Sequence, residues 1–184
     1  MNLNVNDNRL EDLKYEKDLK SKEIADMLKV NESTYSEWEH NRIPIPTKRL
    51  IELADIHKVN IDYMLKLTNV RKYVPKKTSL DLNMVGIRLK EIRQYMNLSL
   101  REWGEKLNYS FSTLASYERG EKLINSEILI NISTITNYSL DWILGRTEEK
   151  QIKNCNEWIF SSLQFSNLLN QYHQIQGRQK NLLI

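Results

Sequence analysis

Residues 22–39 read KEIADMLKVNESTYSEWE, and residues 101–118 read REWGEKLNYSFSTLASYE. The two stretches align without a gap at an offset of 79 positions, and the same offset relates residues 9–68 to residues 88–147. Identical pairs include Arg9/Arg88, Glu23/Glu102, Leu28/Leu107, Glu39/Glu118, Asp62/Asp141 and Thr68/Thr147. A solenoid needs about three repeats to bury a continuous core. Two copies therefore predict two tandem domains of one kind.

The composition is typical of a globular protein, with 184 residues, of which 40% are hydrophobic and 28% charged. Residues 1–69 carry 11 basic and 13 acidic side chains, and residues 86–148 carry 8 of each. The positive excess lies in residues 70–85, with 4 basic and 1 acidic, and in residues 149–184, with 4 and 2. The repeats themselves are therefore not a strongly basic surface.

The single cysteine, Cys155, excludes an intramolecular disulfide and favours a reducing cytosol. The first residues lack the basic and apolar regions of a signal peptide, and no apolar stretch is long enough to span a bilayer. We therefore expect a cytoplasmic protein, encoded by a bacterium or a mobile element, without a membrane partner.

Apolar spacing predicts five short helices in the second copy. The first is Val85–Met96, and a second begins after Ser99, which has Glu102 at the capping-box spacing. Ser110 caps a third helix that runs to Arg119 and ends at Gly120. The last two are Ser126–Thr136 and a short helix over residues 140–144.

The first copy follows the same course, with helices over Arg9–Lys17, Ser21–Leu28 and Glu32–His40. Pro46 lies in the first turn of the fourth helix, and Ile61–Leu65 closes the repeat. A three-residue turn between the second and third helices is typical of a helix-turn-helix domain. The predicted fold class is all-α, with two tandem five-helix helix-turn-helix domains and a C-terminal amphipathic helix.

Residues 22–39 resemble the signature of the phage-repressor/Cro-type helix-turn-helix family. Residues 45–55 with residues 61–65, and residues 133–147 in the second copy, are similar to the family's closing helices. The resemblance covers about two-thirds of the chain and implies lambda-repressor-like domains. It also implies a structural ion pair in each copy between the third and first helices. Glu39 would pair with Lys14, and the equivalent Glu118 would pair with Arg93. Asp62 and Asp141 are expected to act at helix starts.

Proteins of this kind place the third helix in the major groove of double-stranded DNA. The resemblance thus implies base-reading candidates in each copy and cations that contact phosphates. The candidates are Glu32, Ser33, Ser36, Glu37, Lys48, Arg49, Arg71, Lys72, Lys76, Lys77, Arg101, Phe111, Ser112, Thr113, Ser116, Arg119 and Lys122. Backbone N–H groups at the starts of the second helices are further candidates for phosphate contact.

The two sets of base-reading candidates differ in chemistry. Phe111 suits a thymine methyl group, and the serines can bond several bases. Glu32 and Glu37 point carboxylates at a polyanion, although glutamate accepts from cytosine N4. Either both copies bind DNA, or the exposed face of the first copy has become a protein-contact surface.

The connector, residues 70–85, is read either as a solvated basic linker or as an arm that tracks phosphates. Fully extended, it reaches about 55 Å at most, enough to place two domains on successive major-groove faces about 34 Å apart. One chain could then imitate a two-fold repressor dimer with unequal half-sites. The remaining boundaries are 1–69 for the first domain, 86–148 for the second and 149–184 for the C-terminal part.

Residues 152–172 have the broad apolar stripe of an amphipathic helix. Such a helix would dock on the second copy, form a homodimer or bind another protein. The three histidines and one cysteine have no metal-ligand spacing, and no cofactor motif or catalytic set is evident, so we expect no cofactor and no enzyme.

Two functions remain open at this stage. The first is a sequence-specific DNA-binding transcriptional regulator, read as a repressor that occupies an operator with two lobes. The alternative is a partner-binding inhibitor, an antitoxin or anti-defence factor that also regulates its own operon.

Overall fold

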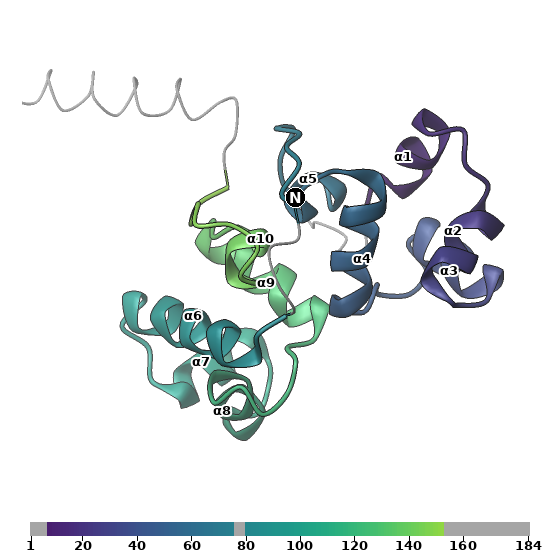
Figure 1. Ribbon diagram of the computed structural model, residues 1–184. Coiled ribbons are helices and arrows are strands. Elements are labelled where there is room, and N and C mark those ends of the chain that lie inside the picture. The colour runs from purple at the N-terminus through teal and green to yellow at the C-terminus, as the bar shows by residue number, and fades with distance from the viewer. Residues whose placement is uncertain (1–6, 76–79, 153–184) are drawn as a thin grey trace, which may run out of the picture. The chain divides into compact units, whose positions relative to one another are not determined.

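The computed structural model describes residues 7–75 and 80–152. In these residues the chain forms helices joined by turns and no strand, apart from one isolated bridge between Tyr138 and Gln151 (Figure 1). The all-α prediction is confirmed. The predicted C-terminal helix lies outside the described residues.

The first lobe contains five helices. They are α1 (Leu10–Glu16), α2 (Ser21–Leu28), α3 (Glu32–Glu39), α4 (Thr47–His57) and α5 (Ile61–Met64). The bounds of α2 agree with the sequence prediction, and those of α1, α3 and α5 differ by one residue at one end or both. Pro46 precedes α4 as its N-cap residue and does not lie inside the helix.

The second lobe repeats the order. Its helices are α6 (Leu82–Tyr95), α7 (Leu100–Leu107), α8 (Phe111–Glu118), α9 (Ser126–Thr136) and α10 (Leu140–Ile143). Helix α6 begins three residues before the predicted start because the Asp81 carboxylate accepts from the backbone N–H groups of Asn83 and Met84. Gly120 follows α8 with φ 68°, as predicted for a helix end.

The equivalent arginines Arg9 and Arg88 connect the start of each lobe to its fifth helix. Arg9 donates to the carbonyls of Tyr63 and Thr68, and its guanidinium lies 4.4 Å from the centroid of the Tyr63 ring. Arg88 donates to the carbonyls equivalent to these, and it stacks over Trp142 at 4.9 Å. The repeated arginine therefore closes each lobe on itself.

The third helices of the two lobes, α3 and α8, differ in their N-terminal caps. Ser110 accepts from the backbone N–H of Thr113, whereas the equivalent Asn31 makes no side-chain bond to α3. We expect Ser110→Ala to lower the free energy of unfolding by about 1 kcal/mol and Asn31→Ala to change it by less than about half as much. Urea unfolding of both variants checks this, and equal losses would contradict the assignment of the cap to Ser110.

His57, at the end of α4, has no exposed surface. Burial, followed by the charge of Lys17, lowers its pKa to about 4, against 6.5 for a free histidine. Because the unfolded chain binds the proton more readily, stability is present above pH 6.5 and is lost as the pH falls toward 4.

The shift corresponds to about 3 kcal/mol of unfolding free energy across this range. Replacement by a residue that does not titrate, His57→Gln, should flatten the pH dependence of urea unfolding between about pH 6.5 and 4. The same change at the exposed His40 serves as the control. If the unfolding free energy of His57→Gln still falls with pH over this range, groups other than His57 cause the pH dependence.

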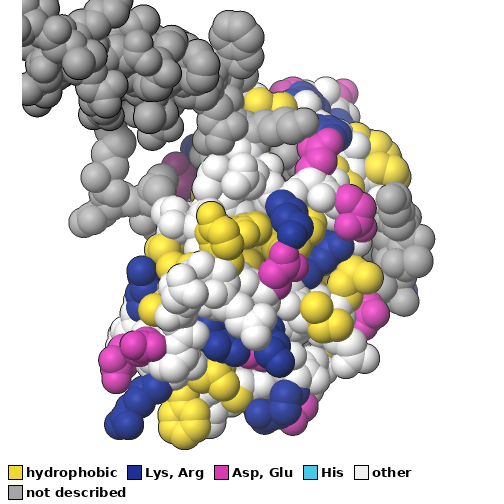
Figure 2. Space-filling model, turned by 90° about the vertical axis from the view of Figure 1, so that its left-hand side faces the viewer, with side chains coloured by type: hydrophobic (Ala, Val, Ile, Leu, Met, Phe, Trp, Pro, Cys, Tyr) yellow, Lys and Arg dark blue, Asp and Glu magenta, His cyan; other side chains and the backbone are white. Residues whose placement is uncertain are grey.

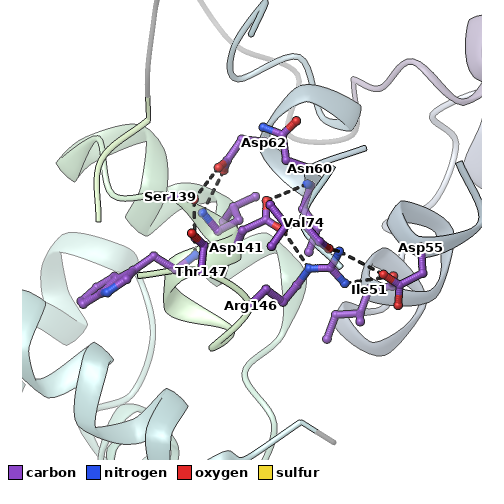
Figure 3. Close-up of polar contacts among 12 residues, drawn as sticks. Ile51, Asp55, Asn60, Asp62, Val74, Ser139, Asp141, Arg146 and Thr147 are labelled. Carbon is purple, nitrogen blue, oxygen red and sulfur yellow. Dashed lines mark hydrogen bonds and ion pairs between the residues drawn. The ribbon is translucent and has the colours of Figure 1, made fainter. Parts of the chain in front are cut away.

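Two buried aspartates join the lobes at α5 and α10. Asp62 accepts from the backbone N–H of Leu140 at 2.8 Å, and Asp141 accepts from the backbone N–H of Ile61 at 2.7 Å. Both act at helix starts as predicted, but the helix start that each aspartate caps belongs to the opposite lobe (Figure 3). Burial, followed for Asp62 by the neighbouring charge of Asp141, raises the pKa of both carboxyls.

Candidate nucleic-acid interface

Each lobe presents a helix-turn-helix pair, α2 with α3 and α7 with α8. The turns begin at Lys29 (φ 54°) and Asn108 (φ 59°), both in the left-handed region. Asparagine adopts this conformation more readily than lysine does. The three-residue turns thus have the predicted length, and they set the third helix of each lobe at an angle to the second.

The inner sides of the third helices are core. Tyr35 has no exposed surface, Trp38 is 3% exposed and Leu114 is 2% exposed. These residues pack in the core and do not present their side chains to a base. Only the opposite side of each helix is free to meet a ligand.

A buried ion pair fixes each third helix to the first helix of its lobe. Lys14 Nζ lies 2.7 Å from Glu39 Oε1, and Ser21 Oγ donates to the same glutamate at 3.2 Å. Arg93 binds Glu118 through two bonds of 2.6 and 2.9 Å. The predicted pairs are confirmed, and the bidentate arginine holds α8 more rigidly than a lysine can.

The exposed side of α8 combines an aromatic ring with hydroxyl groups. The Phe111 side chain is 60% exposed, and Ser112 is also exposed. Ser110 Oγ lies 3.1 Å from Ser112 Oγ and 2.8 Å from the half-buried Thr113 hydroxyl. These groups form a compact polar cluster beside the Phe111 ring at the start of the helix.

Two other candidates on α8 are engaged within the lobe. Ser116 is 8% exposed, and its hydroxyl donates to the Thr113 carbonyl at 2.7 Å. Arg119 is exposed but pairs with Glu121 at 2.6 Å. Ser116 therefore does not present its hydroxyl to a ligand in this arrangement. Arg119 can bind a ligand if its guanidinium leaves Glu121, which is itself exposed to solvent.

The exposed side of α3 is acidic and hydroxylic. Glu32 and Ser33 are exposed at its start. Ser36 is half-buried, with its hydroxyl 3.3 Å from His40 Nδ1, and Glu37 pairs with Arg42 at 2.8 Å. The side of α3 that carries Glu37 is thus not buried in the described part of the chain, but its chemistry differs from that of α8.

The starts of α2 and α7 are partly occupied by glutamates. Glu23 accepts from the Lys20 backbone N–H, and Glu102 accepts from the Ser99 N–H while Ser99 Oγ accepts from Glu102 N–H. The predicted capping box at Ser99 is confirmed. A phosphate at either helix start would have to approach beside a carboxylate.

The cationic candidates near the helices fall into two groups. Lys48, Lys122 and Arg101 are exposed, and Arg101 is only loosely paired with Glu105 at 3.8 Å. Arg49 is half-buried and donates to the Leu28 carbonyl while it pairs with Glu52. The first three cations are available to a polyanion, whereas Arg49 connects α4 to α2.

The described part of the connector is packed against the protein. Arg71 pairs with Glu16 at 2.6 Å and Lys72 pairs with Glu149 at 2.5 Å. Val74 is 7% exposed, and its carbonyl accepts from Arg146 at 2.8 Å. These contacts favour a structural connection over a phosphate-tracking arm. Lys76 and Lys77 lie outside the described residues.

A cleft of about 500 Å³ opens between α1, α2 and α3. Sequence reasoning assigned its α3 side to DNA but missed the α1 side, where Tyr15 is 70% exposed. The residues lining the cleft are Glu11, Lys14, Tyr15, Ser21, Glu32, Ser33, Ser36, Glu39 and His40.

Within residues 7–75 and 80–152, no group of three potential metal-ligating side chains comes together. None of the helices described there is long and apolar enough to cross a membrane. Figure 2 shows basic and acidic side chains interspersed with hydrophobic ones on one face of the molecule. No charge of a single sign dominates the part of that face that is described.

A family model described as helix-turn-helix matches the chain twice, over residues 11–64 and residues 89–143. These segments make up more than half of the chain, which therefore belongs to the helix-turn-helix family. The predicted family is confirmed, and both copies of the repeat are matched.

Among curated proteins, the chain is similar to the HTH-type transcriptional regulator ImmR of Bacillus subtilis (strain 168). The two are 38% identical over 64 residues, which are 35% of this chain and 50% of the relative. The chain thus spans about half the length of the curated relative that it matches. No solved structure matches the chain significantly.

Proposed function

We propose that this protein is a sequence-specific double-stranded DNA-binding transcriptional regulator, a repressor that occupies its operator without catalysis. The observation that carries the proposal is the exposed start of α8, where Phe111 and Ser112 project from a helix fixed by the Arg93–Glu118 ion pair. A rigid helix start of this kind suits the major groove. The family and the similar transcriptional regulator support the same function.

In this proposal Phe111 contacts a thymine methyl group, and Ser112 bonds the edge of a neighbouring base. The exposed Arg101 and Lys122 contact phosphates and position the helix without reading sequence. The first lobe contributes less affinity, because Glu32 adds negative charge close to the polyanion. Glu32 contributes specificity instead, by accepting from cytosine N4.

The test separates base contacts from phosphate contacts. A binding site is selected from randomised duplexes with the full chain, and affinities are measured at several salt concentrations. We expect Phe111→Ala to weaken the selected site by about 10- to 100-fold and to relax specificity at one position. Lys122→Ala should weaken all duplexes alike and reduce the salt slope by about 1.

Ile87→Ala is the matched control for Phe111→Ala, because Ile87 is 65% exposed but belongs to α6 and not to the helix-turn-helix pair. Its DNA affinity should equal that of the unchanged protein. If the unchanged chain binds no duplex in a sequence- and salt-dependent manner, the proposed function is wrong.

A second candidate function is inhibition of a protein partner through the first lobe. It is favoured by the cleft beside α3, where Glu11 and Glu32 present exposed carboxylates. A basic segment of a partner fits this charge. Affinity capture with the unchanged chain and with Glu11→Lys/Glu32→Lys tests it, since a specific partner should be retained only by the unchanged chain.

A further inference from the structure

The hydrogen bonds between the lobes are reciprocal. Ile61 N–H donates to Asp141, and Leu140 N–H donates to Asp62. At the repeat offset of 79, Ile61 is equivalent to Leu140 and Asp62 to Asp141. An exchange of equivalent residues across an interface indicates a two-fold relation, because a head-to-tail arrangement does not return the same contact.

A second hydrogen bond joins the lobes across the same interface. The Thr47 hydroxyl donates to the Ile124 carbonyl at 2.6 Å. The residues equivalent to this pair in the opposite lobes are Ser126 and Ile45, which are 5% and 6% exposed. The interface therefore extends from α5 and α10 to the starts of α4 and α9.

The edges of this interface are not symmetric. Arg146 is 5% exposed, pairs with Asp141 at 2.8 Å and Asp55 at 3.1 Å, and donates to the Val74 carbonyl (Figure 3). The first lobe has Leu67 at the equivalent position. The arginine of the second lobe thus ties α4 and the connector of the first lobe into the interface, which fixes the lobes more firmly than a linker would.

We propose that a single chain binds, as a monomer, a duplex that carries two unequal half-sites in inverted orientation. This inference rests on the proposed DNA-binding function. The two-fold relation between the lobes gives α3 and α8 opposite orientations. The backbone of a duplex also has two-fold symmetry, so helices related in this way match half-sites in inverted order. The half-sites are unequal because Glu32 and Phe111 occupy equivalent positions, and they favour different bases.

The experiment uses the half-sites recovered by selection with the full chain. Duplexes of equal length carry them in inverted order, in direct order, or with one half-site scrambled, and affinity and stoichiometry are measured by sedimentation and native mass spectrometry. We expect one chain per inverted duplex, and about 100-fold weaker binding to the direct and the single-site duplexes. Equal affinity for inverted and direct duplexes, or two chains per inverted duplex, would overturn the proposal.

An interface variant tests the cause of the orientation preference. Asp62→Ala/Asp141→Ala removes both reciprocal caps, and Asp12→Ala removes an exposed carboxylate of α1 as the control. The double variant should lose at least about tenfold of the preference for inverted over direct duplexes while it keeps its affinity for a single half-site. An unchanged preference in the folded double variant contradicts the proposal.

A measurement without DNA separates the two ways to fail. Ser33 and Ser112 are equivalent and exposed, so spin labels on Ser33→Cys and Ser112→Cys, in a Cys155→Ser chain, report the distance between α3 and α8. We expect one narrow distance distribution. A broad distribution overturns the fixed two-fold arrangement even if the chain binds DNA, whereas a narrow one without any duplex binding means that the proposed function itself has failed.

Discussion

Arg146→Met is expected to lower the free energy of unfolding by about 3–5 kcal/mol. Arg146 is the cation between two carboxylates, Asp141, which is 1% exposed, and Asp55, which is 23% exposed. Methionine keeps an unbranched apolar side chain but leaves Asp141 buried without its charge partner. The loss should appear in urea unfolding followed by tryptophan fluorescence, as a lower midpoint.

The loss should also depend on pH in a defined direction. Burial already raises the pKa of Asp141, and removal of the arginine raises it further. Protonation of the carboxyl in the folded state then relieves the uncompensated charge, so the deficit of Arg146→Met should shrink as the pH falls from about 8 to about 5. A deficit that grows over this range would show that Asp141 is not its source.

Two variants control for the loss of an arginine as such. Arg119 forms an ion pair of similar length with Glu121, but both side chains are more than half exposed, so Arg119→Met should cost less than about 1 kcal/mol. Arg146→Met/Asp141→Asn should recover part of the stability, because the asparagine needs no cation. Equal losses for Arg119→Met and Arg146→Met would refute the importance of burial.

The elements of each lobe could be predicted because their signals are local. Ser99 and Glu102 lie three residues apart, and the apolar residues of α9 follow the helical period, so its bounds, Ser126–Thr136, agree with the prediction. The ion pair between Lys14 and Glu39 was accessible only through the family resemblance. Within one lobe, short-range patterns and the family together were sufficient to predict the helices.

The interface between the lobes could not be predicted in this way. Its bonds join residues about 80 positions apart, such as Ile61 and Asp141, and no periodicity in the sequence reports such a pairing. The connector looked like a free basic arm because the carboxylates that neutralise Arg71 and Lys72 lie far away in the sequence, on Glu16 and Glu149.

The sequence contains one signal of the interface between the lobes, which is found only when the two copies of the repeat are compared. Arg146 stands where the first copy has Leu67, although Leu65/Leu144 before the pair and Thr68/Thr147 after it are identical in the two copies. A buried arginine in only one copy marks a contact that the copies do not share. At Ser116 the sequence prediction was wrong. Its outward position was inferred from the family alone, whereas its burial depends on the packing of α8.

The second large effect is expected at Gly86, where α6 crosses the end of α8. A Cβ atom on Gly86 would lie 2.4 Å from the Glu118 carbonyl oxygen and 2.8 Å from that of Tyr117. Both oxygens belong to the backbone, so a rotamer change cannot relieve the clash, and α8 has to move. Overpacking of this kind costs about 1–3 kcal/mol, and the better helix propensity of alanine offsets less than about 1 kcal/mol.

We therefore expect Gly86→Ala to lower the free energy of unfolding by about 2 kcal/mol in urea titrations. Ile87→Ala, one position further along α6 at a side chain that is 65% exposed, should change it by less than about 0.5 kcal/mol. Because Glu118 also anchors Arg93, the displaced α8 should lose part of its rigidity, seen as faster amide exchange at residues 111–118. If Gly86→Ala is as stable as Ile87→Ala, the close approach of α6 to α8 does not exist in solution.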